Sequence, residues 1–285
     1  MKNLNLLRQL LIMAALVYSF SVIGQDSTTN KPTIGKRKHG FYFYWGYNRA
    51  NFSKSTIRFK GDGYDFKIKG MKAEDRQSEV DATYLNPTKI TIPQYNYRLG
   101  YYLKNNWSVS IGFDHMKYVM VSYQDVEMDG YINKEYNSTF GGEYNNETFS
   151  ITPEFLELEH TNGLNYINVQ LDKSMNLLGD TSRLFNLTGA LGLGTGILYP
   201  KSDIKLMHNE RNDQWHLAGY GVSAITNLRL TFKRLIFFEY NIKGGFIHMP
   251  SVLTTSSKSD RANQRFFFLE RFAVLGVNFR LGKRS

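Results

Sequence analysis

Two short stretches of the sequence place histidines beside carboxylates. Asp114 and His115 are adjacent in the first stretch, and Glu159, His160 and Asn162 stand close together in the second. A histidine base that is oriented by a neighbouring group can activate a hydroxyl for acyl transfer. Imidazole and carboxylate also suit zinc, although this spacing matches no recognised ligand motif. The alternative is that both histidines are ordinary polar residues at an interface.

A second set of charged residues is predicted to point into the interior of the fold. The set contains both signs equally and consists of Arg98, Asp114, Asp172, Arg229, Glu239, Lys243, Glu270 and Arg280. Charges in a water-poor interior persist only when they are paired and hydrogen-bonded. We therefore expect a structural plug of ion pairs, with a proton or ion path as the alternative.

The elements that carry these residues are predicted to be strands, because apolar and polar residues alternate with a period of two. The first segment runs from about Gly40 to Arg49, with Phe41 and Trp45 on one face and Tyr44 on the other. The other segments lie near 92–103, 107–122, 162–175 and 183–199, on both sides of a turn at 233–234, and near 265–281. A tilted strand needs roughly 9 to 11 residues to cross a bilayer. The sequence thus predicts an all-β fold, a closed antiparallel transmembrane β-barrel of eight strands.

The segment 183–199 has a rival interpretation as a helix, because residues 184–200 carry no charge. Its glycines Gly192, Gly194 and Gly196 fall on every second position, and each would cost about 1 kcal/mol in a helix. This spacing favours a strand. Small residues on the inner face would also leave room for bulky side chains opposite them, as a narrow filled barrel requires.

The connections between these segments are predicted to alternate in length. Short turns are expected near 104–106, 176–182 and 232–234, and longer outer loops near 50–91, 123–161, 200–215 and 250–264. Short connections inside and long ones outside are typical of outer-membrane barrels. The first long loop contains a hairpin candidate that runs from Ile57 to Ile68 and turns at Gly61-Asp62-Gly63. If this hairpin joins the barrel, the strand count rises to ten.

The beginning of the chain has the order of a secretory signal. Lys2 and Arg8 precede an uncharged apolar run over 10–20, and Gly24 precedes a polar stretch. The run is shorter than the roughly 20 residues of a membrane anchor helix. We expect a signal peptide at 1–24, a periplasmic segment at 25–39 and the barrel at 40–285. The absence of cysteine excludes a lipid anchor on cysteine, disulfides and thiolate metal sites.

Composition favours contact with an anionic membrane surface. The net charge is +10, and 15% of the residues are aromatic, which suits the two membrane interfaces. The nearest anions in an outer membrane are the phosphates of lipopolysaccharide. Nucleic acid is the generic partner of a basic chain, but the export signal argues against it.

The architecture resembles the OmpX/OmpA-like class of small outer-membrane barrels, in which the barrel anchors and the surface loops make contacts. The last segment, with alternating apolar residues up to Leu281, resembles the signal by which the barrel-assembly machinery recognises its substrates. The His160 region also resembles the lipid A deacylase and acyltransferase barrels and the outer-membrane phospholipase. In the deacylase and the phospholipase a serine stands two residues after the catalytic histidine, where this chain has Asn162.

The expected function is therefore a structural or surface-binding barrel in the bacterial outer membrane. Its long outer loops would contact lipopolysaccharide or a protein partner, and no cofactor is expected. The alternative is a lipid-modifying enzyme with a histidine-based site at the outer rim.

Overall fold

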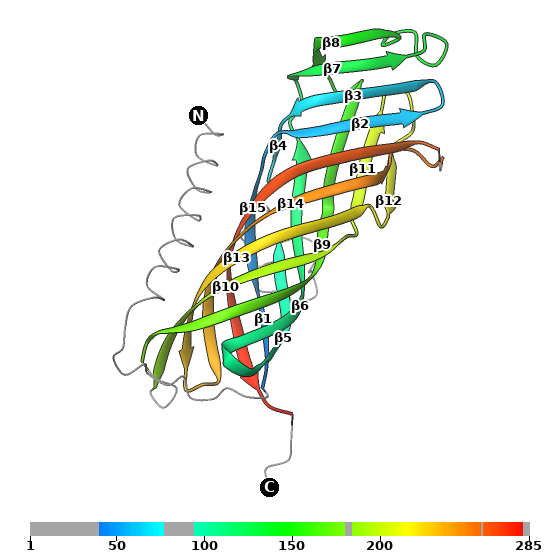
Figure 1. The fold of residues 1–285 in the computed structure, drawn as a ribbon. Helices are drawn as coiled ribbons and strands as arrows, with labels where there is room; N and C mark the ends of the chain where they lie inside the picture. Colours follow the sequence, from blue (N-terminus) through cyan, green and yellow to red (C-terminus); the bar gives the residue numbers. More distant parts are fainter. Residues whose placement is uncertain (1–39, 77–93, 180–183, 258, 282–285) are drawn as a thin grey trace.

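The computed structural model describes residues 40–76, 94–179, 184–257 and 259–281. The predicted signal peptide at 1–24 and the segment 25–39 lie outside these residues. The described residues form one antiparallel sheet of fifteen strands (Figure 1). The strands are β1 (Phe41–Phe52), β2 (Ser55–Gly61), β3 (Tyr64–Met71), β4 (Ala73–Glu74), β5 (Tyr95–Tyr102), β6 (Trp107–Met120), β7 (Gln124–Ile132), β8 (Gly142–Ile151), β9 (Leu156–Leu178), β10 (Phe185–Leu198), β11 (Lys201–Leu206), β12 (Asn212–Trp215), β13 (Gly219–Phe232), β14 (Ile236–Leu253) and β15 (Arg261–Phe279).

Eight of the described strands form a path of ladders that ends on the strand where it begins. The order is β1-β5-β6-β9-β10-β13-β14-β15, and β15 pairs again with β1. Tyr44, for example, lies opposite Arg98 on one side and Gly276 on the other. We call these eight strands the ring. They correspond to the eight predicted segments, with boundaries that differ by a few residues at most ends and by more at the upper ends of β9 and β14.

Two turns at the lower end of the ring in Figure 1 explain why its strands reverse where the sequence predicts. Lys104–Asn106 form a single 3₁₀ turn, and both Asn105 and Asn106 adopt positive φ angles. Lys233 and Arg234 do the same between β13 and β14. Successive positive φ angles match the right-handed twist of flanking strands, which is why such turns join hairpins tightly.

The predicted long loops are mostly sheet rather than irregular chain. The hairpin β2–β3 forms around Gly63, whose φ of 88° suits glycine. β2 pairs with β15 over Arg261–Arg265, beyond the residues Phe268–Phe279 that pair with β1. The hairpin therefore continues the sheet past the end of the ring instead of widening the ring to ten strands. β7 and β8 follow it in the order β2-β3-β7-β8, and we call these four strands the extension.

Several ring strands are far longer than a membrane crossing requires. β9 has 23 residues and β15 has 19, against the roughly 9 to 11 of a tilted transmembrane strand. At about 3.4 Å per residue, β9 extends over roughly 75 Å. Its upper end also pairs with β11, which in turn pairs with β12. About half of such a strand must lie outside any bilayer that the ring crosses.

The buried face changes character along this length. Toward the extension it is an apolar core built from β2, β3, β6, β7, β9 and the upper ends of β14 and β15, with Phe59, Phe66 and Phe155 among its fully buried side chains. Burying each such side chain contributes about 1.5 to 3 kcal/mol. Toward the short turns the buried face is mostly polar, with a small aromatic cluster around Tyr42 and Phe237.

The outward face of the lower ring is apolar instead. Large hydrophobic side chains are exposed there on neighbouring strands, including Leu99, Ile111, Val169, Leu171, Leu193, Val222, Leu228, Leu230, Phe238 and Leu275. Aromatic pairs border this band, with Phe41 against Phe279 and Phe185 against Phe232 at the lower edge. Tyr199 against Trp215 lies at the upper edge. None of the described helical segments is long and apolar enough to span a membrane.

Candidate functional site

Alternation along the ring strands turns a group of charged and amide side chains onto the inner face. Asp114 on β6 lies at its centre, and Lys243 Nζ on β14 donates to Asp114 Oδ2 at 2.5 Å. Asn168 donates to the same oxygen at 2.8 Å, and Asn96 donates to Oδ1 at 2.8 Å. Because β6 and β14 share no ladder, the ion pair joins strands from opposite sides of the ring.

Arg98 extends this group, and the ring makes room for it at a glycine. Its guanidinium donates to the Tyr44 hydroxyl at 3.1 Å and to Asn168 Oδ1 at 2.6 Å, and it lies 4.0 Å from Asp114. A Cβ atom on Gly112 would lie 2.5 Å from the Arg98 Nη2 atom. The small residues of the inner face therefore allow the large ones opposite, as the alternation predicted.

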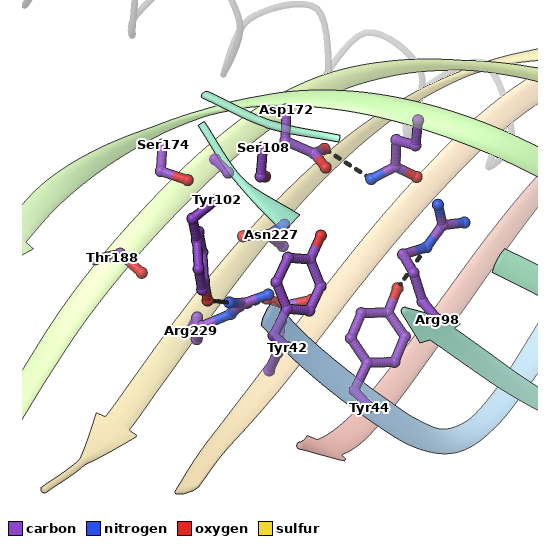
Figure 2. A pocket seen from close by; sticks show the side chains of 13 residues that line it. Tyr42, Tyr44, Arg98, Tyr102, Ser108, Asp172, Ser174, Thr188, Asn227 and Arg229 are labelled. Carbon is purple, nitrogen blue, oxygen red and sulfur yellow. Dashed lines mark hydrogen bonds and ion pairs between the residues drawn. The ribbon is translucent and has the colours of Figure 1, made fainter. Parts of the chain in front are cut away.

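A second ion pair lies nearer the short turns. Arg229 Nε donates to Glu239 Oε2 at 2.5 Å, and Arg229 Nη1 donates to the Tyr102 hydroxyl at 2.6 Å. The guanidinium carbon of Arg229 also stands 4.0 Å from the Phe237 ring centre and 4.7 Å from that of Tyr42. Figure 2 shows Arg229 beside Tyr102 and Tyr42, with Arg98 and Tyr44 on the other side of the cavity.

The cavity between these groups has a volume of about 20 Å³, which is room for about one water molecule. Asp172 and Gln170 line it, and the Gln170 amide donates to the Asp172 carboxylate at 2.6 Å. Such a space does not form an aqueous channel through the ring.

The structure places seven of the eight predicted interior charges on the inner face. Arg98, Asp114, Glu239, Lys243 and Glu270 are almost fully buried, and Asp172 and Arg229 are buried too. The expectation for Arg280 was wrong. Arg280 follows the last residue of β15 and is exposed, because the strand ends at Phe279. Among the described residues the inner face thus carries three cations and four carboxyl groups.

The predicted catalytic cluster around Asp114 does not assemble. Asp114 faces the inner network, whereas the His115 side chain lies on the opposite face of β6 and is also buried, with 2% of its surface exposed. The His115 ring stacks on Tyr95 with centres 4.9 Å apart, and its Nδ1 atom lies 2.7 Å from Asn165 Oδ1. A carboxylate and a histidine on opposite faces of a strand cannot act on one substrate.

His160 is enclosed in the apolar core of the upper ring. Its Nδ1 atom lies 2.8 Å from Ser202 Oγ and its Nε2 atom lies 3.1 Å from Gln264 Oε1. Its ring packs against Tyr118, and none of its surface is exposed. Both ring nitrogens have partners, so we interpret His160 as a structural residue. Sequence reasoning missed Ser202 and Gln264, which lie 42 and 104 residues away in the chain.

The other members of the predicted cluster are also dispersed. Glu159 forms an ion pair with Arg76 at 3.1 Å. The backbone of Asn162 lies in β9, and its side chain is outside the described part of the structure. Within the described residues, no group of three or more histidine, aspartate and glutamate side chains could hold a metal ion.

Replacing His160 with Ala is expected to lower stability without changing lipid chemistry. The change leaves Ser202 and Gln264 without their buried partner, and each unsatisfied group costs about 1 to 3 kcal/mol. Urea unfolding in micelles checks the stability, and mass spectrometry of lipid A from cells that carry the variant checks the chemistry. Altered acylation beside normal assembly of the protein would contradict this assignment.

A row of cations lies on the outward face just above the upper aromatic residues. Arg49 and Arg271 are direct partners in the β1–β15 register, one step above Tyr47. Lys117 stands one step above His115 on β6. Arg271 donates to Asn51 Oδ1 at 2.9 Å, while its Nε atom is buried and has no hydrogen-bond partner. We call Arg49, Arg271 and Lys117 the cation row. Sequence reasoning missed it because it requires the pairing of the first and last strands.

Asp75 is an anion close to the cation row. It accepts the backbone N–H of Ala50 at 3.0 Å, and the charges of Arg49 and Lys117 act on it. The charge of Glu159 also acts on Lys117. Like charges directly opposite each other in a sheet are destabilising, so an anion between them would stabilise the fold.

Comparisons with known proteins give structural likeness alone. No protein-family model and no curated protein matches the sequence. Among solved structures, the outer membrane protein OprG from Pseudomonas aeruginosa is 12% identical, with 86% of this chain and 97% of OprG covered and a TM-score of 0.38. AlkL is 8% identical, with 92% and 100% covered and a TM-score of 0.41. Neisserial surface protein A is 10% identical, with 85% and 97% covered and a TM-score of 0.34.

These structural neighbours are outer-membrane β-barrels of the OmpX/OmpA-like kind. Since every identity is 12% or lower and every TM-score is below 0.5, the functional assignment rests on the ladders, burial and charges of this chain.

Proposed function

We propose that the ring is a closed eight-stranded barrel that spans the bacterial outer membrane. The observation that carries this proposal is the inversion of polarity in the lower ring, where charged residues are buried and large hydrophobic residues are exposed. A water-soluble domain would expose the first and bury the second. Aromatic residues at both edges of the apolar band suit the two membrane interfaces. The short turns then face the periplasm, and the extension stands outside the cell.

The barrel anchors the chain and does not conduct. Its interior is filled by hydrogen-bonded ion pairs, and the cavity of about 20 Å³ among them is no larger than a water molecule requires. The last described strand, β15, with alternating apolar residues up to Phe279, is the segment that we expect the barrel-assembly machinery to recognise. Because the interior is filled, we assign the function of the protein to its surface outside the membrane.

We infer that the cation row binds phosphate groups of lipopolysaccharide. It lies immediately above the upper aromatic edge, which is the height at which lipid headgroups meet the barrel. Arg49 and Arg271 stand side by side there, and guanidinium groups bind phosphate through paired N–H donors. The role that fits these observations is a surface-exposed outer-membrane barrel that is held by lipopolysaccharide and presents its extension. The lipid-modifying alternative is not proposed, because His160 is enclosed.

Replacing both Arg49 and Arg271 with Gln is expected to weaken the stabilisation of the protein by lipopolysaccharide. A ligand that binds the folded state and not the unfolded state raises the unfolding temperature, and tighter binding raises it further. We therefore expect added lipopolysaccharide to stabilise the unaltered protein. The double variant should lose most of that stabilisation. The measurement is thermal unfolding in micelles with lipopolysaccharide or with phosphatidylethanolamine.

The matched control changes Lys104 and Lys233 to Gln at the opposite end of the ring, where both side chains are exposed. This control removes the same charge and should keep the response to lipopolysaccharide. If lipopolysaccharide stabilises the two double variants equally, the proposal that the cation row binds phosphate is wrong. Equal effects of both lipids on the unaltered protein would do the same.

A further inference from the structure

A groove of about 400 Å³ lies on the outward face of the extension, a size typical of small-molecule sites. The polar and aromatic side chains along it come from three neighbouring strands and are Arg58, Asp65, Lys67, Asp129 and Tyr131. Arg58 lies beside Lys67 in the register, Lys67 beside Asp129, and Asp65 beside Tyr131. These residues alternate with core residues such as Phe59 and Ile68, so the apolar core holds them in place from behind.

The charges along the groove are balanced. The Arg58 guanidinium donates to both oxygens of Asp65 at 2.7 Å each, and Lys67 Nζ lies 3.7 Å from Asp129 Oδ2. A charged ligand would meet as many repelling as attracting groups. Carboxylate oxygens and guanidinium N–H groups that already pair can still exchange hydrogen bonds with further hydroxyl groups. The groove is thus suited to a neutral ligand with many hydroxyl groups.

Tyr131 supplies an aromatic surface at the edge of the groove. Its side chain is 45% exposed, and within the described residues its ring contacts no other aromatic ring. Nearby Tyr136 and Tyr144, by contrast, pack against Tyr64 and Phe149. An exposed tyrosine ring offers an apolar face for C–H groups and a hydroxyl for hydrogen bonds.

Gly130 fixes the floor of the groove at the junction of β3 and β7. Its φ is 121°, and a Cβ atom there would lie 2.3 Å from the Asp65 carbonyl oxygen. The two strands therefore approach each other closely between Asp129 and Tyr131. The spacing of the groups that flank this point is set by backbone packing.

We propose that this groove binds a neutral saccharide. The proposal rests on the proposed function, because it requires the extension to face the exterior. The C–H face of a sugar ring packs on Tyr131, and its hydroxyl groups exchange hydrogen bonds with Arg58, Asp65 and Asp129. The saccharide is neutral because the two carboxylates and the two cations that line the site already pair with each other.

The test uses the full-length protein in micelles on an array of neutral, sulfated and sialylated oligosaccharides. We expect retention of a subset of the neutral ones. Tyr131→Ala should weaken that binding about tenfold or more, equivalent to about 1.4 kcal/mol, and Tyr131→Phe should retain most of it because the ring remains. The matched control is Tyr123→Ala, which removes a tyrosine ring that is 76% exposed outside the groove.

Retention of no neutral oligosaccharide by the folded protein would overturn the proposal. Selective binding of the sulfated or sialylated ones, or unchanged binding by Tyr131→Ala, would also overturn it. Because Tyr131 is far from the cation row in the register, stabilisation by lipopolysaccharide should be the same in Tyr131→Ala. Loss of saccharide binding with intact stabilisation by lipopolysaccharide separates this site from the proposed function.

The ion pair also predicts how binding depends on pH. The hydrogen bond from Arg58 lowers the pKa of the Asp65 carboxyl. The carboxylate and its pairing therefore persist above that lowered pKa and are lost only as the pH falls through it. Saccharide binding should be constant from about pH 7 to about pH 5, where an ordinary aspartate is still ionised.

Discussion

Replacing Lys243 with Met is expected to lower the free energy of unfolding by about 3 to 5 kcal/mol. Lys243 is fully buried and donates to Asp114 at 2.5 Å. Without it, Arg98 at 4.0 Å is the only cation near Asp114 among the described residues, and Glu270 remains buried beside it. An uncompensated carboxylate in a water-poor interior is costly, so the folded state loses stability although the methionine fills a similar volume.

Urea unfolding in micelles measures this effect, and two further variants control it. Lys233→Met makes the same substitution at an exposed turn and should change the free energy by about 0.5 kcal/mol or less. Adding Asp114→Asn to Lys243→Met removes the stranded charge and should recover much of the loss. If the free energy of unfolding of Lys243→Met alone lies within about 1 kcal/mol of that of the unaltered protein, the interior is hydrated and is not filled by ion pairs.

Replacing Leu193 with Arg is expected to destabilise the membrane-inserted protein by about 2 to 4 kcal/mol. Leu193 is 71% exposed and lies midway along β10, between the lower and upper aromatic edges. In a water-soluble protein an arginine at so exposed a position would be nearly neutral. The large expected cost arises only because hydrocarbon surrounds this side chain.

Folding into vesicles followed by denaturant titration measures the cost. The control is Thr148→Arg, which puts the same side chain on an exposed position of β8 in the extension and should have little effect. Equal and small changes in both variants would contradict the membrane assignment for the lower ring.

The alternation of residues predicted much of the ring, because burial repeats with a period of two that is set by the strand itself. In β1, Tyr42, Tyr44 and Asn48 are buried, while Phe43 is exposed, as the pattern indicates. The same period of two also predicts that the side chains of His115 and His160 lie on opposite faces of the sheet. His115 follows inward Asp114, and His160 shares its parity with inward Leu164 and Asn168. Continuing the alternation through the residues predicted as a loop is enough to place the two histidines on opposite faces.

Other features depend on contacts between distant segments, which local patterns do not encode. Strands β7 and β8 are rich in polar residues on their outward face, so their composition resembles that of a loop. They form strands because their inward residues pack on the apolar core supplied by β2, β3 and β9. The cation row requires knowing that β1 pairs with β15. The groove on the extension requires three strands in register, whose pairing the sequence alone does not fix.

Labelling of single cysteines on intact cells tests the membrane arrangement most directly, because the chain contains no cysteine of its own. A membrane-impermeant maleimide should label Thr148→Cys in the extension at once. It should label Lys104→Cys at the short turn only after the outer membrane is permeabilised, and Leu193→Cys only after the bilayer is dissolved. Prompt labelling of Leu193→Cys on intact cells, or of Lys104→Cys before Thr148→Cys, would contradict a membrane-spanning ring with its extension outside.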